Sequence, residues 1–371
     1  MTEVPFADLV SMHADLRDSF DEAIAGVFDT GAFILGPAVE QFEQAFAKAT
    51  GRSHCVGVNS GTSALHLALL VAGVGPGDEV VTTPHTWIST SWAVSYCGAT
   101  PVFVDVDPAT GNLDPQLVEP AITSRTKALL PVDLYGNPAD LPAFESLATR
   151  HGIALVDDAC QAHGARLHGR PVGSFGTGAC FSFYPGKNLG AAGEGGAIVT
   201  DDADAAERMR RLRNHAQAGA HEHLEIGYNY RMEGLQGAVL GAKLALLEGW
   251  NDQRREAAAR YATMLAGVAG VVRPTVTPGA DPNWHLYVVR VGERKEVASR
   301  MQAIGIDVRF HYPTPVHLQP AYAFLGHKPG DFPVAERFAA ECLSLPMFPG
   351  ITAAQQERVV DALIAAVEVT A

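Results

Sequence analysis

The sequence of 371 residues has little positive charge and few cysteines, and both shortages exclude classes of function. Its 27 lysines and arginines are outnumbered by 41 aspartates and glutamates, and the net charge of −14 argues against a nucleic-acid or anionic-membrane partner. The five cysteines are odd in number and form no CxxC pair, which is typical of reduced core residues in a cytoplasmic protein.

Membrane and metal signals are also missing. The start, Met1 to Pro5, lacks the basic and apolar stretches of a signal peptide, and no apolar run is long enough to span a bilayer. The run His221-Glu222-His223 lacks the HExxH spacing and an evident third ligand. We therefore expect a cytoplasmic protein without a membrane partner and without a metal site.

The sequence does have a regular alternation of strand-like and helix-like segments. Apolar, β-branched runs recur at residues 80–83, 101–106, 128–132, 154–157, 180–184 and 196–200. Helical patterns lie between many of them, and from Pro37 to Thr50 the residues Val39, Phe42 and Phe46 share one face. This alternation predicts an α/β fold whose mainly parallel sheet is covered on both faces.

A change of pattern suggests a second domain. The pattern becomes one long helix over about 242–265, and the segments after it read as a smaller α+β unit. We therefore predict a large domain of residues 15–245 and a small domain of residues 246–371, with residues 1–14 packing on the small one.

The residue that says most about chemistry is Lys187. A strand-like segment delivers it into a glycine-rich turn, Gly186 to Gly196, where a lysine can form a Schiff base. Such a lysine reacts only when neutral, and burial or a nearby cation lowers its pKa far enough. Taken alone, the pattern is more typical of an exposed hairpin lysine.

A second segment supplies a partner for a cofactor ring. The apolar run at 154–156 ends in Asp157 and Asp158, whose side chains point to opposite faces if the segment is a strand. Pyridoxal phosphate (PLP) needs a carboxylate against its pyridine nitrogen, so that the ring can take up carbanion charge. We choose Asp158, with Asp157 as the alternative; the pair could instead cap the following helix.

A third segment supplies a phosphate anchor. A short strand leads through Ser60, Gly61 and Thr62 into a helix, and backbone N–H groups at a helix start bind phosphate. Gly61 permits close approach and Thr62 adds a hydroxyl donor, although the same pattern is as often a plain helix cap. Together, the three segments predict a PLP site.

These segments stand in a longer ordered series of motifs. The series includes VNSGTSALHLAL, PVDLYGNPADL, VDDACQAHGA, FSFYPGKNLGAAGEGG, GYNYRMEGLQGA and HYPTPVHLQPAY. Over nearly its whole length the chain resembles the DegT/DnrJ/EryC1/StrS family of PLP-dependent sugar aminotransferases, which have the aspartate aminotransferase-like fold type I. The resemblance implies a three-layer α/β/α large domain with a mainly parallel seven-stranded sheet, and a smaller α+β C-terminal domain.

The resemblance also implies roles for single residues in cofactor binding. Trp87 matches the aromatic residue that stacks on the pyridine ring, Gln161 the residue that contacts the 3′ oxygen of the ring, and Ser182 a phosphate-binding hydroxyl. Asn229 matches an asparagine that reaches the phosphate of the neighbouring subunit, which implies a homodimer with a shared active site.

Substrate recognition is less defined. Tyr312 and His317 match candidates for the sugar pocket. Asp133 stands where other members carry histidine and could alter the local charge near the site. Ala216 replaces a common glycine and could reshape a substrate loop. These departures leave Lys187 untouched but put the identity of the substrate in doubt.

The resemblance implies a reaction in two halves. Lys187 moves a proton while L-glutamate or L-glutamine leaves its amino group on the cofactor as pyridoxamine phosphate, and a keto sugar then takes up the amine. The motifs are most similar to those of enzymes that aminate a dTDP-linked 3-keto-6-deoxyhexose. The alternatives are a 4-keto nucleotide sugar, a keto-inositol of aminocyclitol pathways, a sugar dehydratase, which usually has histidine in place of Lys187, and a non-catalytic regulatory protein.

Overall fold

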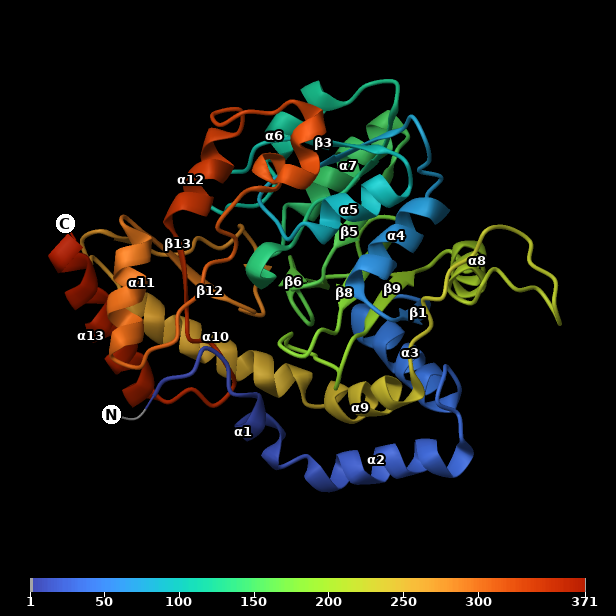
Figure 1. The fold of residues 1–371 in the computed structure, drawn as a ribbon, viewed down its shortest axis with the longest axis horizontal. Coiled ribbons are helices and arrows are strands. Elements are labelled where there is room, and N and C mark those ends of the chain that lie inside the picture. Colours follow the sequence, from blue (N-terminus) through green and yellow to red (C-terminus); the bar gives the residue numbers. More distant parts are fainter. Residues whose placement is uncertain (1–2, 371) are drawn as a thin grey trace.

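A seven-stranded sheet forms the centre of the protein in the computed structural model, which describes residues 3–370 (Figure 1). The strand order is β1-β9-β8-β5-β4-β2-β3. The strands are β1 (His54–Val58), β2 (Glu79–Thr82), β3 (Thr100–Phe103), β4 (Thr126–Leu129), β5 (Ala154–Asp158), β8 (Gly178–Ser182) and β9 (Gly196–Thr200). Only β9 runs against its neighbours within this sheet, so the prediction of a mainly parallel seven-stranded sheet is confirmed.

Alternating side chains of the strands face two different helical layers. On one face Val56, Val80 and Val156 pack against α4 (Gly61–Val71), α5 (Ser89–Tyr96) and α8 (Ala203–Arg213). The other face packs against α3 (Pro37–Thr50), α7 (Leu141–His151) and α9 (Gly234–Leu244) through residues such as Phe181 and Leu155. The predicted α/β/α layering is therefore confirmed, and α3 has the predicted bounds.

A smaller α+β unit follows in the chain. Its antiparallel sheet has the order β10-β12-β13 and packs against α10, α11 and α13 around residues such as Tyr261, Val289 and Leu363. The bounds are β10 (Val271–Val272), β12 (Tyr287–Val291), β13 (Cys342–Leu345), α10 (Leu247–Met264), α11 (Arg294–Ala303), α12 (Pro333–Glu341) and α13 (Ala353–Thr370). A three-stranded ribbon of β6 (Arg166–Leu167), β7 (Arg170–Pro171) and β11 (Ala280–Asp281) joins segments from before and after α10.

The predicted single helix over 242–265 is wrong. Helix α9 ends at Leu244 and α10 begins at Leu247, with a turn in which Leu246 N–H donates to Lys243 O at 3.0 Å. Neither proline nor glycine lies at this break, so the sequence pattern carried no sign of it.

The N-terminal segment is fastened to the small unit. Val4 pairs with Ile306 and lies in the core of that unit, and Met347 N–H donates to Phe6 O at 3.2 Å. Helices α1 (Leu9–Ala14) and α2 (Arg17–Thr30) continue along the lower edge in Figure 1. Met1, Thr2 and Ala371, which the predicted domains include, lie outside the described residues.

Two further observations concern the whole described chain. Between residues 3 and 370, no helix is both long and apolar enough to cross a membrane. All five cysteines are free thiols, and four of them are buried. The predicted domain limits stay a prediction.

Candidate active site

A cavity of about 890 Å³ opens where the carboxyl ends of the parallel strands meet the small unit and the N-terminal segment. Large-domain residues form one wall, and Arg254, His285, Arg309 and His311 contribute to the other. Eight of the ten residues predicted for the site line it: Gly61, Thr62, Trp87, Asp158, Gln161, Ser182, Lys187 and Tyr312. The volume is large enough for a cofactor and a substrate together.

Lys187 lies half-buried in the tight turn that follows β8. Its backbone N–H donates to Tyr184 O at 2.8 Å, and a Cβ at Gly190 would lie 2.3 Å from Pro185 O, so only glycine fits there. Desolvation lowers the pKa of Lys187, while the negative charge of Asp158 opposes the shift. The direction is the one that a nucleophilic lysine needs.

Asp158 ends β5 and points into the cavity. Its Oδ2 accepts a hydrogen bond from the Thr90 hydroxyl at 2.8 Å, and its Oδ1 accepts one from Cys160 N–H at 3.3 Å. These two donors fix the orientation of the carboxylate, and burial raises the pKa of Asp158. A carboxylate held in this way can pair with a protonated ring nitrogen.

Asp157, the alternative to Asp158, points to the opposite face and does not line the cavity. It lies beside Asp133, and both are fully buried. Asp133 Oδ1 accepts from Ala139 N–H at 2.7 Å, but the other three carboxyl oxygens have no donor among the described residues. Burial raises the pKa of Asp133 to about 8 and that of Asp157 well above its usual range. The pair therefore keeps a proton at neutral pH, and Asp133 brings no charge into the cavity.

The first turn of α4 forms the end of the cavity beside Ser182. Ser60 caps the helix, and its Oγ accepts from Ser63 N–H at 3.1 Å. A Cβ at Gly61 would lie 2.7 Å from Ser182 Cβ and 2.9 Å from Cys160 Sγ, so the approach depends on glycine. The first N–H groups of a helix lack partners within it, and together with the Thr62 hydroxyl they fit a phosphate.

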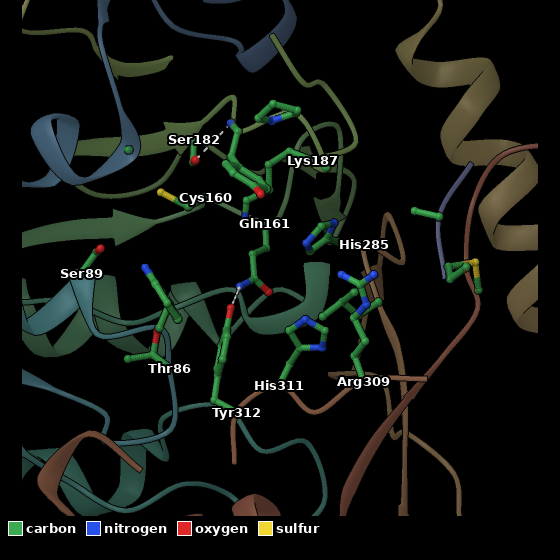
Figure 2. A pocket seen from close by; sticks show the side chains of 18 of the residues that line it. Thr86, Ser89, Cys160, Gln161, Ser182, Lys187, His285, Arg309, His311 and Tyr312 are labelled. Carbon is green, nitrogen blue, oxygen red and sulfur yellow. Dashed lines mark hydrogen bonds between the residues drawn. The ribbon is translucent and has the colours of Figure 1, made fainter. Parts of the chain in front are cut away.

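Gln161 connects the cofactor side of the cavity to the small unit. Its Oε1 accepts from Tyr135 N–H at 2.7 Å, and its Nε2 donates to the Tyr312 hydroxyl at 3.1 Å (Figure 2). The Tyr312 ring lies 5.5 Å from the ring of Trp87, which is 55% exposed at the cavity. Trp87 thus has a free face available for a planar ring.

Two of the predicted residues lie elsewhere. Asn229 is exposed, and it contacts Asn59 Nδ2 through its backbone carbonyl at 3.3 Å. His317 is only 2% exposed; its Nε2 lies 3.2 Å from Glu336 Oε1 and its ring packs on Phe332. The structure therefore does not bring His317 to the cavity, because the side chain is enclosed by the segment 327–336.

The prediction missed the residues that the small unit contributes. His285 Nδ1 lies 3.2 Å from Asn188 Oδ1, and the Asn188 amide donates to Asn251 Oδ1 and Asn283 O. Asn188 Oδ1 is therefore an acceptor, so the proton of His285 is on Nδ1. Desolvation lowers the pKa of His285 well below its usual range and that of His311 to about 4, so both rings are neutral at pH 7.

Within residues 3–370, no group of three or more His, Cys, Asp or Glu side chains could hold a metal ion. His221 and His223 lie on an exposed loop and do not line the cavity.

The sheet, the lysine and the anchored carboxylate together are the architecture of PLP-dependent enzymes of the aspartate aminotransferase type. Sequence comparison narrows this class. The chain belongs to the DegT/DnrJ/EryC1/StrS aminotransferase family, whose sequence profile matches residues 14–364. The predicted family, fold and aminotransferase class are confirmed.

Two curated relatives match almost end to end. A dTDP-3-amino-3,4,6-trideoxy-alpha-D-glucose transaminase of Streptomyces venezuelae is 51% identical over 360 residues, which are 97% of this chain and 95% of the relative. The erythromycin biosynthesis sensory transduction protein EryC1 of Saccharopolyspora erythraea is 48% identical over 361 residues, which are 97% of this chain and 99% of the relative.

Solved structures agree with the sequence comparison. DesV of S. venezuelae, in complex with a ketimine intermediate, superposes with a TM-score of 0.97 at 50% identity and covers 99% of each chain. NtdA of Bacillus subtilis, with bound cofactor PMP, has a TM-score of 0.92 at 29% identity and covers 99% of this chain and 86% of that one. These neighbours support PLP as the predicted cofactor.

Proposed function

We propose that this protein is a PLP-dependent aminotransferase that moves an amino group from L-glutamate or L-glutamine to a nucleotide-linked keto sugar. The acceptor that we favour is a dTDP-type 3-keto-6-deoxyhexose, in amino-sugar biosynthesis. The observation that carries the proposal is the convergence of Lys187, Asp158 and the start of α4 on one cavity. The relative at 51% identity, whose name specifies a 3-amino sugar, supports the choice of acceptor.

The cofactor site uses residues of the large-domain wall. Gly61, Thr62 and Ser182 would hold the phosphate, Trp87 would cover the ring and Gln161 would contact its 3′ oxygen; the cavity contacts described above support these roles. When bound, the cofactor supplies a site that stores the electrons released at the α-carbon of the donor.

Lys187 and Asp158 do the remaining chemistry. Lys187 would hold the cofactor through its aldehyde and, as a free amine, would move a proton at the α-carbon of the donor; its lowered pKa supports this role. Asp158 would pair with the ring nitrogen and keep it protonated, and the hydrogen bonds from Thr90 and Cys160 hold the carboxylate in place.

The functional unit in this proposal is a homodimer in the cytoplasm. Asn229 is exposed and outside the cavity of its own chain, so it is free to reach the cofactor phosphate of a second copy. Apolar side chains on the same loop and on α5 are also exposed, among them Ile226 at 87%, Leu224 at 57% and Tyr96 at 53%. A second copy would bury them.

The name of the sensory relative at 48% identity favours the regulatory alternative. A purely regulatory protein does not need a lysine with a lowered pKa opposite an anchored carboxylate. The 4-keto sugar and keto-inositol alternatives differ from our proposal only in the acceptor.

A spectroscopic experiment tests the first half of the reaction. The holoprotein is expected to show a visible cofactor band that bleaches with excess L-glutamate or L-glutamine, and borohydride reduction should label Lys187. Lys187→Ala should abolish both, whereas Lys328→Ala, at an exposed position, should change neither. A protein that takes up no PLP would overturn the proposal and favour the regulatory alternative.

A second experiment identifies the acceptor by comparing turnover of dTDP-linked 3-keto and 4-keto sugars. Exclusive turnover of the 4-keto sugar would exclude our choice.

A further inference from the structure

The small-unit wall of the cavity contains two arginines that the roles above do not use. Arg254 comes from α10, and Arg309 from the segment between α11 and β13. The acidic side chains that line the same cavity are Asp8, Asp158 and Glu194. Asp158 belongs to the large-domain wall, and Asp8 caps α1 by accepting from Ser11 N–H at 2.9 Å. Glu194 also belongs to the large domain, so the charged side chains that the small unit itself contributes to the cavity are the two arginines.

Arg254 is buried without a counter-ion. It is 5% exposed, and its Nη1 donates to the carbonyls of Met347 at 3.1 Å and of Trp284 and His285 at 3.4 Å. Its Nε has no partner, and no ion pair to Arg254 occurs among residues 3–370. Burial lowers its pKa to about 10, so the side chain is still charged at pH 7. A buried charge without a counter-ion is unfavourable, and an anionic group of a ligand would relieve this.

Arg309 supplies a second charge that is accessible from the cavity. Its guanidinium lies 5.0 Å over the ring of Phe6, which stacks on His311 at 5.7 Å. Its Nη2 pairs with Asp307 at 3.0 Å, but both side chains are exposed, and such a pair contributes little. Figure 2 shows Arg309, His311 and His285 grouped on one side of the cavity. Since both imidazoles are neutral, the positive charge of this wall comes from the arginines.

We propose that Arg309 and Arg254 form a carboxylate subsite that binds the amino donor and so presents its amine to Lys187. This inference rests on the proposed function and adds the means by which the donor is recognised. A planar carboxylate matches the fork of N–H groups of a guanidinium. The same cavity is lined by apolar side chains that suit the methylene chain of a five-carbon amino acid, namely Phe6, Leu9, Met12 and Phe348.

The diphosphate of the acceptor is the other anion that could use these arginines. The donor fits better because Arg254 is only 5% exposed and a carboxylate group is the smaller of the two anions. A nucleoside diphosphate is larger and must keep a path to solvent for its nucleoside.

The test compares two anions that cannot react. Glutarate has the carbon chain of the donor without its amine, and dTDP has the diphosphate of the acceptor without its sugar. Binding of each to the holoenzyme is measured by calorimetry. Arg309→Gln is expected to lower the affinity for glutarate at least ten-fold and the affinity for dTDP less than two-fold. The affinity of Arg309→Lys for glutarate should lie between those of wild type and Arg309→Gln. Arg300→Gln, which removes an exposed arginine of α11, is the matched control and should change neither.

Steady-state kinetics provide the second readout. Arg309→Gln should raise KM for L-glutamate about ten-fold and leave KM for the keto sugar unchanged. Weaker dTDP binding with unchanged glutarate binding would assign the arginines to the diphosphate and overturn the proposal, as would no change in either ligand. If wild type itself shows no spectral response to amino acids, the proposed function fails; if it responds and Arg309→Gln responds identically, only the subsite fails.

Arg254 needs a gentler change because it also binds three carbonyls. Arg254→Lys keeps the charge but not the fork, and we expect a several-fold loss of glutarate binding with a lower melting temperature. Unchanged glutarate affinity in a folded Arg254→Lys protein would remove Arg254 from the subsite and leave Arg309 to be judged by its own variants.

Discussion

Strand β5 ends in two aspartates whose surroundings are opposite. Asp158 faces the cavity and has two donors, the Thr90 hydroxyl and the Cys160 N–H. Asp157 faces the other helical layer, where it meets a second carboxyl group, Asp133, and no donor apart from the proton that the pair keeps. The two residues have the same chemistry and adjacent positions, and only the alternation of the strand separates them.

This difference shows what turns a buried carboxyl group into a functional one. Donors orient Asp158 and stabilise its charge, so it can act on a ligand. Asp157 is buried without such donors and stays protonated, so its pair with Asp133 brings no charge to this face of the sheet. A carboxyl group next to a site is therefore not part of the site unless something in the fold stabilises its ionised form.

The largest effect is expected when the charge of Asp158, on the cavity side of β5, is removed. Asp158→Asn keeps the shape and the acceptor for Thr90 but cannot pair with a protonated ring nitrogen. We expect the rate of the first half-reaction to fall by at least about 10²-fold, as when a preorganised electrostatic group is removed. Stopped-flow absorbance measures the rate, and a melting temperature within a few degrees of wild type shows that the fold is intact. A loss below three-fold would contradict the role.

The second test concerns the packing beside Asp158. Gly61→Ala places a Cβ within 3 Å of Ser182 and Cys160, so the start of α4 must move. We expect cofactor affinity to fall at least ten-fold, with a loss of about 1–3 kcal/mol of stability. Equilibrium dialysis measures the first quantity and denaturant unfolding the second. Gly241→Ala is the control, because nothing lies within 4 Å of that position in α9 and alanine favours a helix. Equal cofactor affinity in both variants would refute the proposal that the start of α4 binds the cofactor phosphate.

The third test concerns Asp157 and Asp133, on the side of β5 that faces away from the cavity. In the folded state burial raises the pKa of Asp133 to about 8 and that of Asp157 well above its usual range, whereas an unfolded aspartate has a pKa of about 3.9. The folded state therefore binds more protons, and the pair's contribution to stability falls as pH rises from about 4 through about 8. Asp157→Asn removes one of these groups and gives Asp133 a donor.

The expected outcome for Asp157→Asn is a flatter stability curve. The variant should gain about 1–3 kcal/mol relative to wild type between pH 5 and pH 9, the range for satisfying a buried polar group. Urea unfolding at several pH values measures the gain, with Asp133→Asn as the companion variant. Transamination should change by less than about three-fold, because neither side chain reaches the cavity. Parallel curves for wild type and both variants would show that the pair holds no extra proton.

The smallest effect is expected at His317. Its side chain is enclosed and bonded to Glu336, so His317→Gln should leave KM for the keto sugar unchanged and lower stability by about 1 kcal/mol. Steady-state kinetics with the keto sugar check this. Tyr312→Phe is the contrasting change, because it removes the acceptor for Gln161 Nε2 at the cavity. A raised KM in His317→Gln alone would return His317 to the sugar pocket.

The sequence could predict one wall of the site because that wall is built from short contiguous motifs. Gly61, Asp158 and Lys187 each end or follow a strand, and the carboxyl ends of parallel strands meet at one edge of the sheet. The periodicity likewise predicted the central strands within a few residues and α3 without error.

The other wall depends on contacts that no local pattern encodes. Arg254 is in a helix that reads as charged and exposed, yet tertiary packing buries it against Trp284 and Met347. The proton on His285 Nδ1 depends on Asn188, nearly a hundred residues away in the chain. The partnership of Asp133 with Asp157 also exists only in the folded state. Such features depend on which surfaces pack together in the folded protein, and this packing cannot be read from a single sequence.

The bond between Met347 and Phe6 has a consequence for how the protein matures in the cell. Both residues line the cavity, and they stand near opposite ends of the chain. The ribosome must release the chain as far as Met347 before this wall can close, whereas residues 54–200 emerge much earlier. We therefore expect the growing chain to acquire a cofactor-binding half first and the ability to choose its amino donor last.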